Sequence, residues 1–304
     1  MSARRVTVGE ALHDAAARLA AAAGGAARLD AEVLLAHVVG GGRTALITRR
    51  DEQLEDESRA RYAALVARRA AREPVAYLTG EREFWSLPLE VDARVLIPRP
   101  ETEGVVEAAL AAVGELSRHS RAPLRIVDVG TGSGAIAVAL AHELARRPPV
   151  PAASVVALDR SLACLQVARR NAARHAPPGR VSLLCSDLTR ALGPRSVDLL
   201  VANPPYLSQD EIERVSPEVR AEPVAALLGG GKDGSDTLRA LLDEATRVLQ
   251  QGGFVVSEIG STQGQTVAAL ARDLGFEEIE IERDLAGLDR VVKARWRSGL
   301  GATA

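Results

Sequence analysis

Apolar side chains in the first 75 residues recur every three or four positions, which is the spacing of one face of an α-helix. Thr7 and Glu10 form a T-x-x-E capping box ahead of the first such run, and Asp30 stands where it can cap a second one. A third run covers about 57–72 and ends before a proline. This part of the chain is therefore predicted to be a small bundle of amphipathic helices.

The pattern changes between Glu83 and Ile97, where short apolar runs predict a β-hairpin. From Glu101 onward, short β-branched runs alternate with amphipathic helical stretches. The predicted strands lie at 125–129, 154–158, 180–184, 197–202, 254–258, 277–281 and 289–293, and the main helices lie near 135–146, 162–175 and 237–250. The last two strands complete the sheet and are candidates for an antiparallel edge.

Alternation of this kind is typical of an α/β fold, in which helices cover both faces of a parallel sheet. We place a helical domain at residues 1–78, a β-hairpin linker at 79–97 and the sheet domain at 98–297. Each division follows a change in the hydrophobic period.

Charge and cysteine content make several kinds of function less expected. The 304 residues include 38 Lys and Arg against 40 Asp and Glu, a formal net charge of −2. Proteins that bind duplex nucleic acid through its phosphates normally carry a basic excess, so no direct nucleic-acid binding is expected. Cys164, Cys185 and the five histidines stand in no metal-ligand spacing, so no metal site is expected.

A membrane or secreted location is also disfavoured. No apolar run reaches the roughly 18 residues that a membrane span needs. The alanine-rich start resembles a signal peptide, but Glu10, His13 and Asp14 interrupt its apolar stretch. We therefore expect a cytoplasmic protein.

A glycine-rich turn, Asp128-Val-Gly-Thr-Gly-Ser-Gly134, follows the first predicted strand of the sheet and opens a helix. Glycines let the backbone turn sharply and let a ligand approach without meeting a Cβ atom. The free amides at the helix start favour an electron-rich partner.

The next two strands also end in candidate ligand-binding residues. One ends at Asp159, where a βαβ unit places a carboxylate for ribose hydroxyls, and the other is followed by Asp187. Three successive strand ends at one edge of the sheet predict a site for an adenosyl group. The alternative is that both aspartates only cap helices.

Asn203-Pro-Pro-Tyr206 follows the fourth strand of the sheet. Consecutive prolines lack amide hydrogens and have a fixed φ, so they hold a rigid loop whose carbonyls have no local donors. A substrate NH₂ group fits such a loop, with one hydrogen bonded to the Asn203 side-chain oxygen and the other to the Pro204 carbonyl. Tyr206 can supply a flat wall against a planar amide or base.

A planar sp² nitrogen is a poor nucleophile because its lone pair is delocalised, whereas a sulfonium methyl group is a good electrophile. The main task predicted for the site is alignment for in-line displacement. Positioning of this kind can supply roughly 7–11 kcal/mol, and it requires no perturbed acid or base.

These motifs resemble the seven-strand, Rossmann-like methyltransferases that use S-adenosylmethionine, in which N-P-P-Y marks the branch that methylates planar nitrogens. Three stretches, Glu73–Gly80, Arg82–Leu89 and Leu96–Glu103, are similar to the PrmC/HemK family of release factor glutamine methyltransferases. The resemblance covers nearly the whole chain. It implies a methyltransferase domain at 98–297 and a helical domain that docks the protein substrate.

The resemblance also implies residue roles. Residues that would bind S-adenosylmethionine, which leaves as S-adenosylhomocysteine, are Gly130, Thr131, Gly132, Ser133, Gly134, Asp159, Asp187, Leu188 and Asn203. The substrate glutamine would be held by Asn203, Pro204, Pro205 and Tyr206, of which Asn203 and Pro204 would be catalytic. Relatives often have an aromatic residue at Leu188, so adenine would be covered here without stacking.

The implied substrate is N5 of the glutamine in the Gly-Gly-Gln loop of class I peptide chain release factors. Alternatives are a glutamine of a ribosomal protein or an exocyclic base nitrogen of DNA or RNA. A different class of function, a non-catalytic adenosyl-binding module, is disfavoured because Asn203 and both prolines are present.

Overall fold

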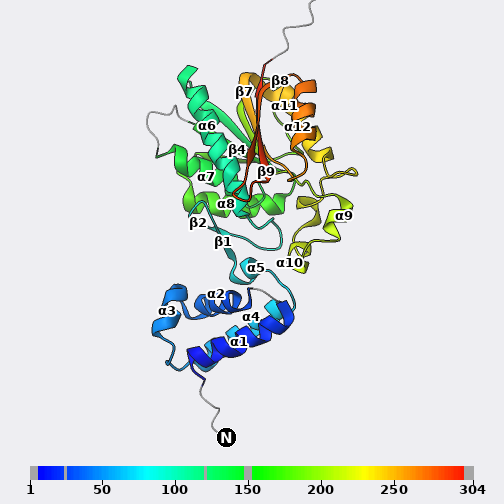
Figure 1. Cartoon of the computed structure of the whole chain (residues 1–304). Coiled ribbons are helices and arrows are strands. Elements are labelled where there is room, and N and C mark those ends of the chain that lie inside the picture. The colour runs from blue at the N-terminus through cyan, green and yellow to red at the C-terminus, as the bar shows by residue number, and fades with distance from the viewer. Residues whose placement is uncertain (1–5, 24–25, 120–121, 147–152, 298–304) are drawn as a thin grey trace, which may run out of the picture. The chain divides into compact units, whose positions relative to one another are not determined.

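The computed structural model describes residues 6–23, 26–119, 122–146 and 153–297 (Figure 1). The chain divides into two compact units. One contains the residues up to Glu81 together with Ser216–Ala221, and the other contains 82–215 and the chain from Glu222 onward. Within the described ranges, no helix is both long and apolar enough to cross a membrane.

The first unit is helical. Its helices are α1 (Val8–Ala23), α2 (Ala27–Val39), α3 (Gly42–Thr48), α4 (Asp56–Ala70), α5 (Val75–Thr79) and the short α10 (Pro217–Arg220). The predicted capping box is present, because the Thr7 amide donates to Glu10 Oε2 at 2.9 Å and the Glu10 amide donates to Thr7 Oγ1 at 3.2 Å. The apolar faces meet in one core that includes Leu12, Leu19, Leu34, Leu35, Tyr62 and Val66.

The prediction that Asp30 caps the second helix is wrong. Helix α2 begins at Ala27, so Asp30 lies in its first turn, and its carboxylate accepts a hydrogen bond from Arg69 Nε at 2.7 Å. Arg69, itself buried, also donates to Glu218 of the same unit at 2.8 Å. A buried guanidinium requires acidic partners, and we infer that this tertiary demand outweighed the local capping preference.

The second unit is built on a seven-stranded sheet with the order β5-β4-β3-β6-β7-β9-β8. The strands are β3 (Leu124–Val129), β4 (Ala153–Asp159), β5 (Val181–Cys185), β6 (Val197–Ala202), β7 (Leu249–Glu258), β8 (Phe276–Arg283) and β9 (Asp289–Trp296). Strands β3 to β7 pair in parallel, and β9 pairs antiparallel with both β7 and β8. The α/β fold and the antiparallel edge predicted from the sequence are confirmed.

Helices cover both faces of this sheet (Figure 1). One side has α6 (Glu103–His119), α7 (Ala135–Leu144) and α8 (Leu162–His175), and the other has α11 (Asp236–Val248) and α12 (Gly264–Asp273). Ile126 of β3 belongs to the core on the α6 and α7 side, while its neighbour Val127 belongs to the core on the α11 side. Because both faces are buried, the central strands are mostly apolar.

Three short helical segments also belong to the second unit: η1 (Pro100–Thr102), α9 (Gln209–Ile212) and η2 (Val224–Ala226). Segment η1 follows the hairpin, and η2 follows the Asn203 loop. Residues of η1 contact the candidate site, and residues of η2 line it.

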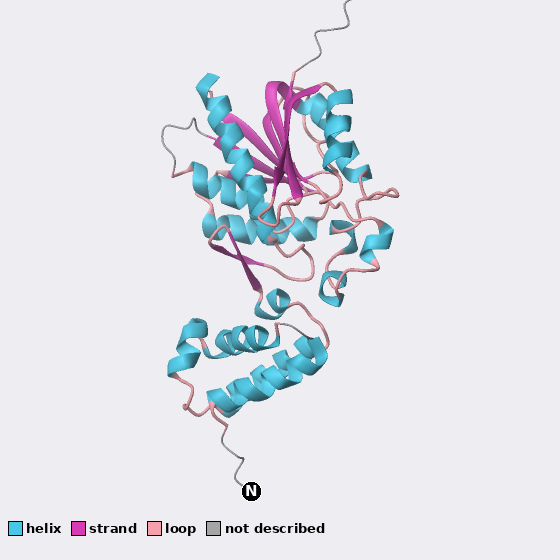
Figure 2. Ribbon diagram, in the orientation of Figure 1, coloured by secondary structure: helices cyan, strands magenta, loops and turns pink. Residues whose placement is uncertain are grey.

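The predicted hairpin is shorter than expected. Its strands are β1 (Glu81–Phe84) and β2 (Leu87–Glu90), drawn as a separate magenta pair in Figure 2. The apolar run that follows forms no strand, because the Ile97 amide donates to the buried carboxylate of Glu222 at 2.9 Å. Arg99 forms an ion pair with the same carboxylate. This tertiary contact holds the segment as a loop.

Candidate active site

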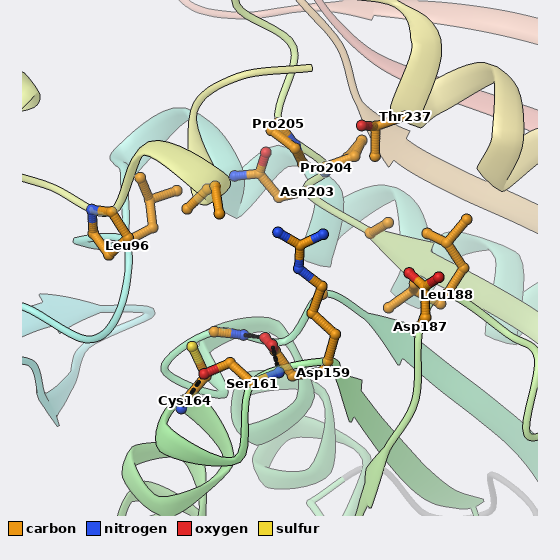
Figure 3. A pocket seen from close by; sticks show the side chains of 18 of the residues that line it. Leu96, Asp159, Ser161, Cys164, Asp187, Leu188, Asn203, Pro204, Pro205 and Thr237 are labelled. Carbon is orange, nitrogen blue, oxygen red and sulfur yellow. Dashed lines mark hydrogen bonds between the residues drawn. The ribbon is translucent and has the colours of Figure 1, made fainter. Parts of the chain in front are cut away.

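The carboxyl ends of β3, β4, β5 and β6 surround one cavity of about 900 Å³ (Figure 3). In Figure 3, Asn203 lies across this cavity from Asp159, and Asp187 with Leu188 forms a further side. Several candidate site residues line it: Gly130, Gly132, Asp159, Asp187, Leu188, Asn203, Pro204 and Pro205. The strand-end loops singled out in the sequence therefore come together at one edge of the sheet.

The other candidate residues surround the cavity without lining it. Thr131 Oγ1 donates to Asp128 Oδ2 at 2.6 Å, and the Ser133 carbonyl accepts from Asn171 Nδ2 at 2.8 Å. A Cβ atom at Gly134 would lie 3.1 Å from the Ala168 side chain, so this glycine permits close packing of α7 against α8. These contacts hold the glycine turn in place.

Two glycines of the turn present their backbone to the cavity. Gly130 has φ of +72° and Gly132 has φ of +55°, the left-handed region that favours glycine. A Cβ atom at Gly130 would meet nothing within 4 Å, so the space beside it is open to a ligand.

Asp128 lies beneath this turn and is 1% exposed. Its Oδ2 accepts from Thr131 and, at 3.1 Å, from the Ala137 amide, whereas Oδ1 finds no donor among the described residues. Burial raises the pKa of the carboxyl group to about 7, although the hydrogen bonds from Thr131 and Ala137 oppose this. A buried acceptor without a donor fits a ligand or bound water that supplies one.

Asp159 braces the turn from the neighbouring strand. Its Oδ2 accepts from the Gly132 amide at 3.0 Å and its Oδ1 from the Ser161 amide at 2.8 Å. Helix α8 is capped by the Ser161 side chain, which accepts from the Cys164 amide at 3.3 Å. Asp159 is therefore not the helix cap, and each carboxylate oxygen keeps a further lone pair for a hydroxyl group.

Asp187 and Leu188 follow β5. The Asp187 side chain is 50% exposed and forms an ion pair with Arg190 at 2.9 Å. Leu188 has φ of +49°, a left-handed conformation that is strained for a bulky residue. Strain of this kind is common at ligand sites, and sequence patterns do not reveal it.

The Asn203 loop is fixed from two directions. Asn203 Nδ2 donates to Thr102 Oγ1 at 3.0 Å, and the Tyr206 hydroxyl donates to Glu258 at 3.1 Å. The backbone of the loop contacts a glycine-rich segment, since a Cβ atom at Gly229 would lie 2.7 Å from the Pro205 carbonyl oxygen. A Cβ atom at Gly234 would lie 2.1 Å from the Tyr206 carbonyl oxygen.

Sequence reasoning missed part of the lining. Other residues that line the cavity include Leu96, Ser161, Cys164, Thr237 and much of 223–230. Ser161 could have been found as a helix cap two residues after a strand end. The segment 223–230 carries no local signal, because only tertiary folding brings it to this edge of the sheet.

A mostly parallel sheet of this topology, with the glycine turn and the Asn-Pro-Pro-Tyr loop at neighbouring strand ends, defines the protein as a Rossmann-like methyltransferase. Residues 113–232 match the methyltransferase small domain, and residues 10–80 match the PrmC N-terminal domain.

Similarity to curated proteins extends over both units. The chain is 43% identical over 272 residues to the release factor glutamine methyltransferase of Burkholderia pseudomallei, covering 88% of this chain and 91% of that protein. It is 43% identical over 286 residues to that of Moorella thermoacetica (94% and 97% covered) and 39% identical over 269 residues to that of Escherichia coli (88% and 92% covered). The chain belongs to the release factor glutamine methyltransferase family.

Membership of a methyltransferase family implies S-adenosylmethionine as the methyl donor. The residues present fit this molecule, since the open space at Gly130 and the accepting oxygens of Asp159 meet at one cavity.

Proposed function

We propose that the protein transfers a methyl group from S-adenosylmethionine to the side-chain N5 of the glutamine in the Gly-Gly-Gln loop of class I peptide chain release factors. The observation that carries this proposal is the oriented Asn203 amide in the same cavity as the glycine turn. The substrate is supported by the names of the relatives, which match over most of the chain.

The glycine turn and the next two strand ends would hold the methyl donor. When bound, S-adenosylmethionine supplies an electrophilic methyl group on a sulfonium sulfur. Gly130 and Gly132 would allow its close approach, Asp159 would accept from ribose hydroxyls, and Asp187 with Leu188 would border the adenine. Thr131, Ser133 and Gly134 would contribute by holding the turn.

Asn203 and Pro204 would orient the substrate amide. Asn203 Oδ1 and the Pro204 carbonyl accept no hydrogen bond from the described residues, so both are available to the two hydrogens of a glutamine NH₂ group. Holding both hydrogens fixes the plane of the amide and directs its nitrogen. Pro205 keeps the loop rigid, and we propose Tyr206 as a wall beside the amide.

We further propose that the helical unit docks the release factor and that the enzyme acts in the cytoplasm, where release factors reach the ribosome. Domain limits of 1–78, 79–97 and 98–297 remain our proposal for this division of labour. No direct nucleic-acid contact is proposed, since the net charge of −2 offers no general attraction to phosphates.

Mass spectrometry of a purified release factor, after incubation with the enzyme and S-adenosylmethionine, tests the function. We expect the mass to rise by one methyl group in place of one hydrogen, localised to the Gly-Gly-Gln peptide. An unmodified release factor, with the enzyme still binding S-adenosylmethionine, would contradict the proposed substrate. Assays on ribosomal-protein glutamine and on nucleic-acid nitrogens would then separate the alternatives.

A further inference from the structure

A buried carboxylate connects with two residues of the Asn203 loop. Glu258, at the end of β7, is 1% exposed, and Thr102, in η1, is 3% exposed. Thr102 Oγ1 lies 2.6 Å from Glu258 Oε2, and the Tyr206 hydroxyl lies 3.1 Å from Glu258 Oε1. The same Thr102 oxygen lies 3.0 Å from Asn203 Nδ2.

Two hydroxyl groups contact the buried carboxyl group of Glu258. Burial raises the pKa of this group above its ordinary value, although the hydrogen bonds from Thr102 and Tyr206 and the positive charge of Arg290 oppose the rise. The negative charge of Glu101 adds a smaller rise to this pKa. We infer that the carboxyl group is ionised, since each of its oxygens contacts a hydroxyl group that can donate to it, and an ionised carboxylate only accepts hydrogen bonds.

The direction of the bonds then fixes the orientation of the Asn203 amide. Thr102 has a single hydroxyl hydrogen, and Glu258 takes it, so the Thr102 oxygen can only accept at its contact with Asn203. Asn203 must therefore present its NH₂ group to Thr102, which turns Oδ1 away. Without this constraint the two ends of the amide are nearly the same shape and could exchange places.

We propose that Thr102 and Glu258 are positioning residues that hold the Asn203 side chain with its oxygen toward the substrate amide. The inference rests on the proposed function, in which Asn203 Oδ1 accepts from the substrate. Neither Thr102 nor Glu258 belongs to the lining of the cavity, so both would act through Asn203 and, for Glu258, also through Tyr206.

Thr102→Val tests this proposal, because valine keeps the shape of threonine and removes the hydroxyl group. We expect kcat for a Gly-Gly-Gln peptide to fall roughly tenfold to a hundredfold, as for loss of one oriented hydrogen bond in a buried site. The affinity for S-adenosylmethionine, measured by calorimetry, should stay within about twofold of the wild-type value. Thr102→Ser restores the hydroxyl group and should recover most of kcat.

A matched control separates positioning from stability. Thr189, also buried, donates through Oγ1 to Glu244 at 2.6 Å and has no bond to Asn203. Thr189→Val should lower the melting temperature by an amount comparable to that of Thr102→Val while leaving kcat near the wild-type value at saturating S-adenosylmethionine. Equal falls in kcat for the two valine variants would overturn the proposal.

A double variant shows whether Thr102 acts through Asn203. In an Asn203→Ala background, Thr102→Val should cause no further fall in kcat, because the oriented amide is already gone. A full additional fall would contradict the proposal. If Asn203→Ala alone keeps wild-type activity, the proposed role of Asn203 fails instead, so the two failures are distinguishable.

Glu258→Gln is a second variant, should Thr102→Val fold poorly. Thr102 and Tyr206 donate to different oxygens of Glu258, and in glutamine one of these two positions is an NH₂ group, which donates instead of accepting. We expect a fall in kcat with little change in S-adenosylmethionine affinity. An unchanged kcat in a folded Glu258→Gln protein would overturn the positioning role of this residue.

Discussion

Asn203 is the residue on which the proposed alignment depends most directly. Replacing it with alanine removes one preorganised polar group at the reacting nitrogen, so turnover should fall by roughly 10²–10³. Binding of S-adenosylmethionine, followed by calorimetry, should survive because the glycine turn and Asp159 are untouched. Near-normal turnover by Asn203→Ala would contradict the catalytic role of this side chain.

Asp128 should make stability depend on pH. Its pKa is about 7 in the folded protein against an ordinary value of 3.8, because the carboxyl group is buried. Between these two pH values, the Asp128 carboxyl group keeps a proton in the folded state that it has lost in the unfolded state. Its contribution to stability is therefore fully present below about pH 4 and is lost as the pH rises through about 7.

The Asp128→Asn variant should lack this dependence. Urea unfolding of both proteins across this pH range, without S-adenosylmethionine, measures the difference in unfolding free energy between variant and wild type. We expect the difference to shift in favour of the variant as the pH rises. A difference that does not change with pH would mean that Asp128 titrates near its ordinary value.

At the scale of elements, a glycine-rich segment shapes the Asn203 loop. A Cβ atom at Gly229 would lie 1.9 Å from the Gly234 carbonyl oxygen and 2.7 Å from that of Pro205, and neither backbone atom can move without displacing the loop. Gly229→Ala should therefore destabilise the protein by about 1–3 kcal/mol and reduce turnover.

Gly114, in contrast to Gly229, has room for a side chain, since it lies on the exposed face of α6, away from the helix ends. A Cβ atom there would meet nothing within 4 Å. Gly114→Ala should raise the unfolding free energy by up to about 1 kcal/mol, because alanine is the better helix former. Chemical denaturation of both glycine variants measures the contrast, and a stabilising Gly229→Ala would show that the segment is not tightly packed.

Element prediction succeeded where the local pattern was complete. The predicted helix at 162–175 coincides with α8, whose first turn is capped by Ser161 and whose sequence is strongly periodic. It failed where a distant partner decided the outcome, as at Asp30, which bonds to Arg69, and at Ile97, which bonds to Glu222. Asp30 lies far from Arg69 in the sequence, and Ile97 lies far from Glu222. No local sequence pattern could therefore predict these two hydrogen bonds.

At the scale of the whole molecule, the proposed docking role of the N-terminal helices predicts a difference between substrates. Removing residues 1–78 should leave S-adenosylmethionine binding intact. Methylation of an intact release factor should fall far more than methylation of a short Gly-Gly-Gln peptide, because only the intact protein can contact the missing helices. Kinetic comparison of the two substrates measures this, and equal losses on both would count against docking.

The sequence by itself determined the order of helices and strands, the glycine turn and the rigid Asn-Pro-Pro-Tyr loop, because hydrophobic period, glycine freedom and proline geometry act over a few residues. Parallel strands also fix which loops share an edge, so the meeting of Asp159, Asp187 and Asn203 could be foreseen. Tertiary structure alone decided the orientation of the Asn203 amide. That orientation depends on Thr102, which lies 101 residues before Asn203, and on Glu258, which lies 52 residues after Tyr206. Both residues meet the loop only in the folded chain.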